Sequence, residues 1–316
     1  RNFKMLSARI KYSLALRKEN SGNIKKARLY WENISEVIEK NPKQYDIAIS
    51  YAQGVPTFYT IDKVDAYKKF AWVNVTYRLQ GEERQFQKRY YDRYDKIIAV
   101  SDSAKDIFLE NFNEYKNKTE VIYDINDYKM INNLSSMDKG YDDDFDGIRI
   151  LTIGRLAAQK GYDIALDACK RLNNKKINFR WYVLGVGPLE SEIKNFIEEN
   201  NLNDRFKLLG VRANPYPFIR NCDIYVQTSK FEGFGLAIAE ARILNKLVVT
   251  TEFDSVYNQM VQRKNGLVVG MDGESVCNGI LELLENKKLS KDILEYLKNE
   301  KKGNLEEVKK IYELIN

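Results

Sequence analysis

The sequence predicts an α/β protein of two doubly wound domains, each built around a parallel sheet. Three observations support this prediction. The 316 residues exceed the usual size of one domain. Short β-branched runs alternate with helical patterns along both halves. A polar stretch rich in aspartate separates the two halves.

The second half shows the clearer alternation. Its expected strands are continuous apolar runs, as in parallel sheets buried on both faces. They lie at 148–153, 179–184, 206–209, 223–227, 246–250 and 267–269. Helices are expected near 162–172, 189–200, 235–245 and 274–286. This pattern predicts a doubly wound domain over residues 147–288.

The first half repeats the pattern less fully and predicts a smaller domain over residues 1–146. Expected strands lie at 46–50, 70–73, 97–100 and 120–123, and expected helices near 3–18, 24–40, 82–95 and 103–112. The stretch 135–147 holds Gly, Ser and clustered Asp that cannot support a core, so it is the expected interdomain linker. Residues 289–316 read as helices broken at Gly303, and we expect them to pack back toward the first domain.

Composition excludes several kinds of chemistry. The chain has no histidine, which excludes a Ser-His-Asp or Cys-His arrangement and any zinc site that needs imidazole. Its three cysteines are widely spaced and predict neither a disulfide framework nor a metal cluster, which favours a cytoplasmic setting. No run approaches the roughly 20 apolar residues of a membrane span. The chain opens at Arg1 without a signal pattern, so residues upstream are expected to be missing.

The most informative stretch is TSKFEGFGLAIAE at 228–240, between an expected strand and an expected helix. Gly233 and Gly235 flank Phe234 at this turn. Two glycines let backbone N–H groups approach a ligand closely, and a helix N-terminus favours an anion. The turn therefore predicts a binding site for a phosphate-bearing ligand.

Two carboxylates frame that turn. Glu232 lies just before the helix, whereas Glu240 lies more than a turn inside it. A carboxylate accepts two hydrogen bonds at once, so one of them suits the vicinal hydroxyls of a ribose and the other the hydroxyls of a hexose. A nucleotide sugar offers both groups.

The segment GRLAAQKG at 154–161 supplies two cations, Arg155 and Lys160, after the first strand of the same domain. Cleavage of a sugar-diphosphate bond develops negative charge on the leaving phosphate. Fixed cations stabilise that charge more than they stabilise the intact donor, and they can replace a metal ion. A further glycine turn at 184–188 ends the second strand at the carboxyl edge, where ligands of open α/β folds bind.

Arg155 and Lys160 as R-x4-K, with Glu232 and Glu240 as E-x7-E, resemble family 4 of the retaining GT-B glycosyltransferases over nearly all of 148–286. The resemblance implies two Rossmann-like doubly wound domains that face each other across a cleft. It also implies transfer of a hexose with retention at the anomeric carbon and without a metal ion or other cofactor.

The resemblance also implies roles for individual residues. Arg155 and Lys160 would hold the diphosphate, and Glu240 the ribose. Glu232 and the backbone of 233–236 would contact the donor sugar, while the nucleobase would lie against Gly210 and Val211. The expected catalytic residues are Glu232, Arg155 and Lys160, and the expected donor-binding residues are Gly154, Gly210, Val211, Gly233, Phe234, Gly235, Leu236 and Glu240.

Three departures from the family pattern stand out. Asn74 replaces a histidine of many relatives, so it is either a contact to donor or acceptor or a structural residue. Asp124 takes an asparagine position in the hinge motif at 122–127. The first strand and its Gly-rich loop are not visible, so the N-terminal domain is expected to be truncated.

Two further segments admit two interpretations each. The run Asp142, Asp143, Asp144 and Asp146 contains the D-x-D of metal-dependent transferases, although its polar setting favours a solvated linker. Residues 1–30 hold nine Lys and Arg against one Glu, and Phe3, Leu6, Ile10 and Leu14 share a helix face there. That helix either packs on its own domain or binds an anionic membrane surface, which we favour.

The sequence thus predicts a retaining hexosyltransferase that uses a nucleotide sugar, with UDP favoured over GDP or ADP. A glycan or lipid-linked acceptor in surface polysaccharide or glycoconjugate synthesis is expected, and no nucleic-acid partner. The expected location is the cytoplasm, peripheral on the inner face of the membrane. The alternative is a transferase-like protein that binds a glycan or partner without turnover, which Asn74 and the missing first strand would permit.

Overall fold

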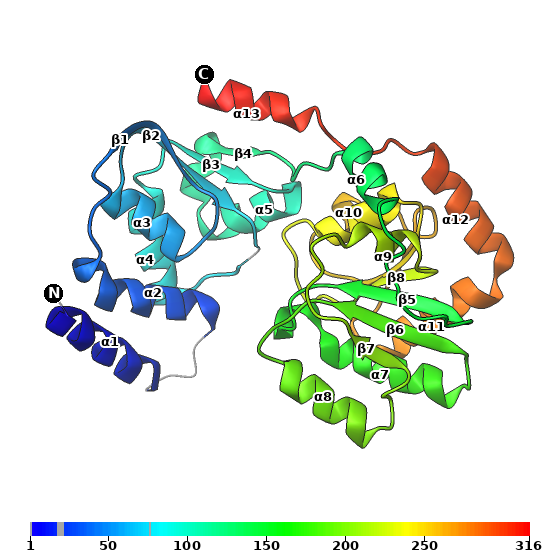
Figure 1. Cartoon of the computed structure of the whole chain (residues 1–316). Coiled ribbons are helices and arrows are strands. Elements are labelled where there is room, and N and C mark those ends of the chain that lie inside the picture. Colours follow the sequence, from blue (N-terminus) through cyan, green and yellow to red (C-terminus); the bar gives the residue numbers. More distant parts are fainter. Residues whose placement is uncertain (1, 18–21, 76) are drawn as a thin grey trace. The chain divides into compact units, whose positions relative to one another are not determined.

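The computed structural model describes residues 2–17, 22–75 and 77–316. The chain divides into two compact units, one formed by residues 1–123 with 309–316 and the other by residues 124–308. Each unit contains a parallel β-sheet with helices packed around it (Figure 1). The prediction of two α/β domains with parallel sheets is confirmed.

The first unit has a four-stranded parallel sheet in the order β1-β2-β3-β4. Its strands are β1 (Gln44–Ser50), β2 (Asp65–Val73), β3 (Lys96–Ala99) and β4 (Thr119–Val121). Its helices are α1 (Asn2–Arg17), α2 (Asn23–Ile34), α3 (Val55–Lys63), α4 (Gly81–Tyr91) and α5 (Asp102–Asn111), with 3-10 turns at Ser35–Val37 and Asn113–Lys118. The elements lie close to their predicted positions except for α3, which the sequence analysis does not predict. The predicted end of the first helix, at Lys18, lies outside the described residues.

The helix α3 forms from a strand-like sequence, VPTFYTI, that is rich in β-branched and aromatic residues. Gly54 precedes it with a φ of +85°, which favours glycine, and Pro56 stands in its first turn, where no N–H is needed. Phe58 of α3 is buried against Trp31 and Phe86. Tertiary packing therefore outweighs the local strand propensity here.

The second unit has a six-stranded parallel sheet in the order β10-β9-β8-β5-β6-β7. Its strands are β5 (Ile148–Ile153), β6 (Phe179–Leu184), β7 (Phe206–Leu208), β8 (Ile224–Gln227), β9 (Leu247–Thr251) and β10 (Leu267–Val269). Its helices are α6 (Tyr128–Ser135), α7 (Tyr162–Asn174), α8 (Glu190–Glu199), α9 (Tyr216–Arg220), α10 (Leu236–Ile243), α11 (Gly273–Glu285) and α12 (Lys287–Asn299), with 3-10 turns at Ala158–Lys160 and Val256–Asn258. All six predicted strands are present, whereas α6 and α9 are additional.

Hydrophobic clusters cover both faces of this second sheet. Successive residues of a strand point to opposite faces, and Ile150 and Leu151 of β5 accordingly belong to different clusters. The cluster of Ile150 includes side chains of α7, α8, α11 and α12, whereas that of Leu151 includes side chains of α9 and α10. This two-sided burial explains the continuous apolar runs of the strands.

The stretch 135–147 is not an interdomain linker, contrary to the prediction. It belongs to the second unit, and the boundary between the units falls between Tyr123 and Asp124. Tyr141 is buried, its hydroxyl donates to the carbonyl oxygen of Phe218 at 3.0 Å, and its ring centroid lies 4.6 Å from that of Tyr182. Aromatic side chains within the acidic stretch thus anchor it to the domain, which its Asp and Gly content does not predict.

The C-terminal residues are shared between the units. α12 packs in the second unit, where Leu289, Ile293 and Leu297 join the core. Residues 309–316, most of α13 (Glu307–Ile315), belong to the first unit, and Lys310 Nζ donates to the carbonyl oxygen of Val121 at 3.4 Å. The prediction that all of 289–316 packs toward the first domain is therefore wrong for α12, because its apolar face is buried in the second unit's core.

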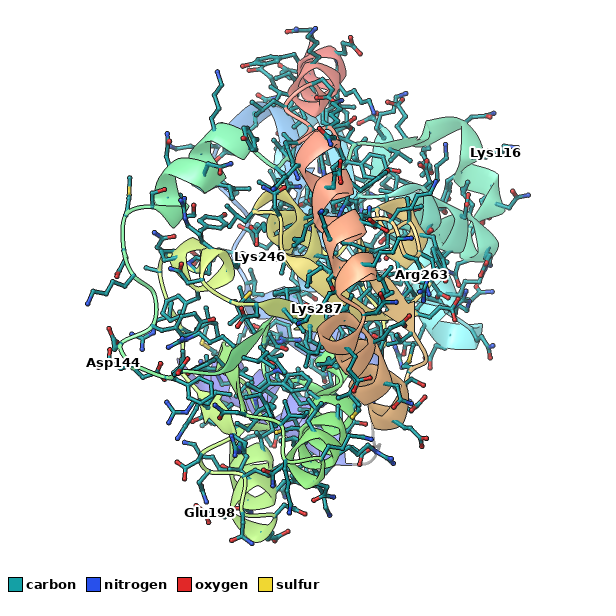
Figure 2. All side chains as sticks on the ribbon, turned by 90° about the vertical axis from the view of Figure 1, so that its right-hand side faces the viewer. Lys116, Asp144, Glu198, Lys246, Arg263 and Lys287 are labelled. Carbon is teal, nitrogen blue, oxygen red and sulfur yellow. The ribbon has the colours of Figure 1, made fainter. Side chains whose placement is uncertain are left out.

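Charged side chains cover the outside of the second unit. Asp144, Glu198 and Lys287 are exposed, and Asp144 and Glu198 lie at the margin of the view in Figure 2. Among the described helices, none combines the length and the apolar character needed to cross a membrane.

Candidate active site

The predicted site residues of the second unit gather where the strand order of its sheet reverses. β5 pairs with β6 on one side and with β8 on the other. The loops that follow β5 and β8 therefore leave the carboxyl edge next to each other, at the topological switch point where open α/β sheets bind ligands. These loops are 154–161, with the two predicted cations, and 228–235, with the glycine turn.

Close backbone packing holds the two loops together. The amide of Lys230 donates to the carbonyl oxygen of Gln159 at 2.8 Å, and Thr228 Oγ1 donates to that of Lys160 at 2.9 Å. Gly161, with a φ of +63°, lies so close that a Cβ there would stand 1.9 Å from the carbonyl oxygen of Thr228. Only glycine fits at this crossing, because both the space and the backbone conformation exclude a side chain.

The predicted cation and the first predicted acid are in direct contact. Lys160 Nζ lies 2.5 Å from Glu232 Oε1, and only 8% of Glu232 is exposed. Ser229 Oγ donates to the same oxygen at 2.6 Å, and Gln227 Nε2 does so at 3.2 Å. Three donors therefore converge on one carboxylate oxygen, which offsets the desolvation of this buried charge.

Arg155 stands apart from this contact. Its side chain is exposed and makes no ion pair with any residue that the structure describes. The backbone of the preceding residue, Gly154, is held by a hydrogen bond. The hydroxyl of Tyr162 donates to the carbonyl oxygen of Gly154 at 2.8 Å. A Cβ on Gly185 would lie 2.0 Å from that same oxygen. The glycine turn after β6 thus packs directly against the start of the cation loop.

The glycine turn before α10 is braced by the segment after β9. Gly235 precedes the helix with a φ of +88°. Gln259 Nε2 donates to the carbonyl oxygen of Phe234 at 2.5 Å and to that of Gly235 at 3.1 Å, while Ser255 Oγ donates to that of Glu232 at 2.9 Å. These hydrogen bonds hold the three carbonyl groups toward the protein interior. Leu236, the first residue of α10, has 41% of its surface exposed.

Glu240 pairs with a residue that the sequence analysis did not identify. The hydroxyl of Tyr216, in α9, donates to Glu240 Oε1 at 3.1 Å. Burial raises the pKa of the Glu240 carboxyl to about 7, and the hydrogen bond from Tyr216 opposes part of this shift. Burial, together with the Glu240 carboxylate, raises the pKa of Tyr216 to about 12. Glu240 thus titrates near neutral pH.

The segment proposed to face the nucleobase lies beside the same edge. The amide of Gly185 donates to the carbonyl oxygen of Gly210 at 2.8 Å, and Gly210 has a φ of +70°. Val211 follows with 70% of its surface exposed. An exposed apolar side chain beside this edge of the sheet is suited to contact the face of a flat ring.

Asn74 belongs to the first unit and follows β2 at the carboxyl edge of that sheet. Its Nδ2 donates to the carbonyl oxygen of Tyr51 at 3.0 Å. Its Oδ1 is buried and has no hydrogen-bond partner among the described residues. The amide therefore has a structural contact on one side and, among the described residues, an unused acceptor on the other.

Of the acidic run, only Asp143 joins a packed ionic cluster, whereas Asp142, Asp144 and Asp146, which form the D-x-D pairs, are exposed. Asp143 pairs with Arg149 at 2.6 Å and with Arg180 at 3.0 Å, and the hydroxyl of Tyr182 donates to it at 2.6 Å. Burial acts to raise the pKa of Asp143, but these three hydrogen bonds together hold it below its ordinary value. Its carboxylate already has cationic partners, which favours a structural role over a metal ligand.

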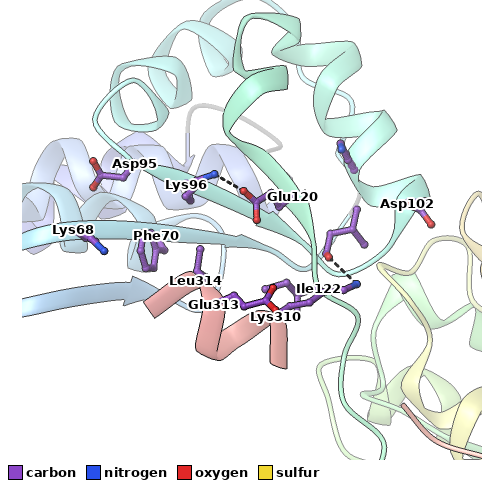
Figure 3. A pocket seen from close by; sticks show the side chains of 12 residues that line it. Lys68, Phe70, Asp95, Lys96, Asp102, Glu120, Ile122, Lys310, Glu313 and Leu314 are labelled. Atoms are coloured by element: carbon purple, nitrogen blue, oxygen red, sulfur yellow. Dashed lines mark hydrogen bonds and ion pairs between the residues drawn. The ribbon is translucent and has the colours of Figure 1, made fainter. Parts of the chain in front are cut away.

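A separate hollow of about 700 Å³ lies in the first unit, between strands of its sheet and α13 (Figure 3). Its charged side chains balance, with Lys68, Lys96, Lys105 and Lys310 against Asp95, Asp102, Glu120 and Glu313. Lys96 and Glu120 form an ion pair there. The hollow runs along a face of the first unit's sheet and includes none of the predicted site residues.

Sequence reasoning missed the residues that hold the two acids. Ser229 and Gln227 had a signal, since polar side chains that end a buried strand need partners. Tyr216 gave none, because it lies 24 residues from Glu240 along the chain. Such a contact exists only once α9 packs beside α10.

Glycine turns, a buried acid and two cations in the loops at the switch point of a parallel sheet are typical of proteins that bind phosphate-bearing nucleotides. The chain belongs to the glycosyl transferases group 1 family, whose model matches residues 141–300, more than half of the chain. The chain spans about half the length of the curated relatives it matches.

One such relative is an N-acetylgalactosamine-N,N'-diacetylbacillosaminyl-diphospho-undecaprenol 4-alpha-N-acetylgalactosaminyltransferase of Campylobacter jejuni. It is 30% identical over 203 residues, which is 64% of this chain and 54% of the relative.

Two solved structures show the fold. TarM of S. aureus, determined with fondaparinux, alpha-GlcNAc-glycerol and UDP, matches with a TM-score of 0.67 at 17% identity, over 92% of this chain and 59% of that chain. HepE of Anabaena, determined with UDP, matches with a TM-score of 0.67 at 18% identity, over 83% of this chain and 75% of that chain. The structural neighbours are GT-B glycosyltransferases, so the predicted GT-B class with two Rossmann-like domains is confirmed.

Proposed function

We propose that this chain transfers a hexose from a nucleotide sugar to a glycan or lipid-linked acceptor, with retention at the anomeric carbon and without a metal ion. The observation that carries the proposal is the contact between Lys160 and Glu232 at the switch point, 2.5 Å apart. A cation for the diphosphate and an acid for the sugar thus occupy the same small volume, as the reaction requires.

In the proposed reaction the bond between the anomeric carbon and the diphosphate oxygen breaks, and the electron pair leaves with the phosphate. Lys160 and the exposed Arg155 stabilise the charge that develops there, which lowers the barrier because the intact donor carries less of it. Glu232 accepts a hydrogen bond from the transferred sugar. The acceptor oxygen bonds to the anomeric carbon, and its proton passes to the oxygen of the leaving diphosphate.

Glu240 would hold the ribose of the donor. A carboxylate accepts hydrogen bonds from both vicinal hydroxyls, and Glu240 lies on the helix that begins at the glycine turn. UDP is favoured as the nucleotide, since TarM and HepE were both solved with UDP. The name of the C. jejuni relative, with its diphospho-undecaprenol acceptor, supports a lipid-linked acceptor and a role in surface polysaccharide or glycoconjugate synthesis.

A screen of nucleotide sugars tests this proposal. Thermal shift identifies the donor, because a ligand that binds only the folded state raises the melting temperature. Mass detection of products then identifies the transfer, and anomeric NMR identifies retention. Transfer that continues in EDTA is expected. Loss of transfer in EDTA that Mg²⁺ restores would contradict the metal-independent mechanism and favour the D-x-D alternative.

A binding protein without turnover is the second candidate. The unused acceptor of Asn74, in place of the histidine of many family members, is the observation that favours it. Binding of UDP alone would not distinguish the two candidates, since an inactive protein can bind UDP. Release of free sugar or formation of a glycoside does distinguish them, and their absence with every UDP-sugar that binds would favour the second candidate.

We further propose that α1 lies on an anionic membrane surface, which would place the protein at the inner face of the membrane. Its apolar side chains Phe3, Leu6, Ile10 and Leu14 are 83%, 55%, 52% and 52% exposed. They are therefore not packed on the described part of the domain, which α1 contacts through the opposite face, where Ala8 is buried. Exposed cations border the apolar face, as in helices that bind anionic lipids.

Liposome flotation tests the membrane proposal. The chain should float with vesicles that contain phosphatidylglycerol and detach as salt rises. A variant with Leu6→Glu and Ile10→Glu should stay unbound while its melting temperature holds, because these side chains are exposed. Equal flotation with neutral vesicles, or none with anionic ones, would contradict the proposal.

A further inference from the structure

Glu232 is held by a continuous chain of hydrogen bonds that starts inside strand β8. The hydroxyl of Tyr225 donates to Gln227 Oε1 at 2.5 Å, and Gln227 Nε2 donates to Ser229 Oγ at 2.6 Å. Ser229 Oγ then donates to Glu232 Oε1 at 2.6 Å. Each hydrogen atom in this chain points toward the carboxylate.

The three side chains that form this series of hydrogen bonds are shielded from water. Tyr225 and Ser229 are fully buried, and Gln227 is 2% exposed. In such surroundings hydrogen bonds are strengthened and an unmade one is costly. Each side chain therefore has one stable orientation, and its hydrogen bond fixes the orientation of the next side chain in the series.

The contacts divide the two carboxylate oxygens between different tasks. Lys160, Ser229 and Gln227 all donate to Oε1 of Glu232. Within the part of the chain that the structure describes, no hydrogen bond reaches Oε2. One oxygen is thus used by the protein, and the other keeps its acceptor capacity for a ligand.

We propose that Tyr225, Gln227 and Ser229 are positioning residues that hold Glu232 by one oxygen and present its other oxygen to a hydroxyl of the transferred sugar. The inference rests on the proposed function. It assigns to this network the recognition of the sugar and not of the nucleotide, because none of its members contacts Arg155 or Glu240 by a hydrogen bond in the described structure.

In this arrangement Lys160 contacts Glu232 in the free protein and the diphosphate in the complex with the donor. A diphosphate that arrives in the site draws the Lys160 ammonium toward its own charge, which weakens the contact with Glu232. The hydrogen bonds from Ser229 and Gln227 remain, since both donors are neutral and buried. The network therefore keeps Glu232 in place when Lys160 moves toward the phosphate.

The variant Ser229→Ala tests the proposal, because it removes the last hydroxyl of the chain with little change in volume. We expect the affinity for UDP to stay near that of the unmodified chain and the melting temperature to fall only by the amount that the loss of one buried hydrogen bond causes. The kcat/KM for hydrolysis of UDP-glucose and UDP-N-acetylglucosamine should fall about tenfold to a hundredfold, the usual effect of losing a hydrogen bond to a charged group. Most of the loss should lie in kcat.

Ser290→Ala is the matched control. Ser290 is also a buried serine of the second unit, and its hydroxyl donates to the carbonyl oxygen of Leu283 at 2.6 Å. Its loss removes a buried hydrogen bond without touching Glu232. It should leave kcat/KM unchanged and lower only the melting temperature. An equal loss of kcat/KM in both variants would reduce Ser229 to a structural residue and overturn the proposal.

A second measurement needs no donor. Infrared difference spectra between the chain and its Glu232→Gln variant isolate the carboxylate bands of Glu232. The separation of the two stretching bands reflects how unequally the oxygens are hydrogen-bonded, so it should narrow in Ser229→Ala and not in Ser290→Ala. An unchanged separation overturns the positioning role. If the separation narrows but the unmodified chain neither binds UDP nor hydrolyses a UDP-sugar, the proposed function fails and the hydrogen-bond assignment stands.

Discussion

The hydroxyl of Tyr216 donates a hydrogen bond to Glu240 Oε1 at 3.1 Å, and this contact joins α9 to α10. Glu240 carries the most consequential titration of the proposed site, since burial raises its pKa to about 7 from an ordinary value of 4.5. A carboxylate binds ribose hydroxyls as an acceptor only, whereas the protonated form offers one acceptor fewer. With Glu240 in its proposed role of holding the ribose, we expect its protonation state to control nucleotide binding near neutral pH.

Binding of UDP is expected to weaken as the pH falls through about 7. Below this pKa a proton must leave Glu240 before the ribose binds, so the affinity contributed by Glu240 drops by about tenfold for each pH unit. Calorimetry with UDP from pH 5 to 9 measures the effect. The phosphates of UDP also titrate, so the Glu240→Gln variant, which cannot ionise, serves as the reference. Parallel affinity profiles in the two proteins would refute this role of Glu240.

The Tyr216→Phe variant should shift that profile to higher pH. The hydrogen bond from Tyr216 opposes the rise of the Glu240 pKa, so its loss leaves more of the carboxyl protonated at pH 7. We expect UDP to bind about tenfold more weakly at pH 7 and almost normally at pH 9. Tyr296→Phe, at a partly exposed tyrosine of α12, is the control. If the variant loses as much affinity for UDP at pH 9 as at pH 7, the loss comes from altered packing and not from the pKa of Glu240.

Glu240 also predicts how stability depends on pH. Its folded-state pKa lies above the ordinary value, so the folded state binds the extra proton between about pH 4.5 and 7. The resulting stabilisation is fully present below pH 4.5 and is lost as the pH rises through 7, at about 1.4 kcal/mol per pH unit in between. Urea denaturation followed by circular dichroism should show this fall in the unmodified chain. In Glu240→Gln the same slope should be missing; if it persists, another group is responsible.

Replacement of Lys160 by alanine should abolish most turnover while the fold survives. In the proposed reaction the ammonium stabilises charge that develops on the leaving phosphate, and removal of one such group typically costs about 10²-fold to 10³-fold in kcat. Arg155→Ala should act in the same direction. Lys170→Ala, at an exposed lysine of α7, should change nothing. Full activity in both Lys160→Ala and Arg155→Ala would remove the cations from the mechanism.

Gly161→Ala should separate the two loops of the site. The new Cβ would meet the carbonyl oxygen of Thr228 and occupy a φ of +63°, so strain and a steric clash act together. We expect a loss of about 2 kcal/mol or more in unfolding free energy together with a loss of turnover. Gly22→Ala is the control, since a Cβ there meets nothing within 4 Å. Equal melting temperatures in the two variants would contradict the close contact between Gly161 and the backbone of Thr228.

Local patterns in the sequence were sufficient for much of this protein. Continuous apolar runs at β5 and β8 identified a buried parallel sheet, because such strands have no polar face. The glycines and charged residues at their ends identified the candidate site, because the carboxyl ends of parallel strands meet at one edge. The family resemblance rested on the same four side chains, Arg155, Lys160, Glu232 and Glu240.

Tertiary structure alone decided the rest. Whether the acidic stretch 135–147 was a linker or part of a domain depended on where Tyr141 found a partner, and Phe218 lies 77 residues away. The same holds for the contact of Tyr216 with Glu240 and for the convergence of Ser229 and Lys160 on one oxygen of Glu232. Local sequence encodes propensity and periodicity, whereas burial and hydrogen-bond partners arise only when distant segments pack. Such packing buries Glu240, which raises its pKa, and brings Lys160 and Ser229 to the same oxygen of Glu232.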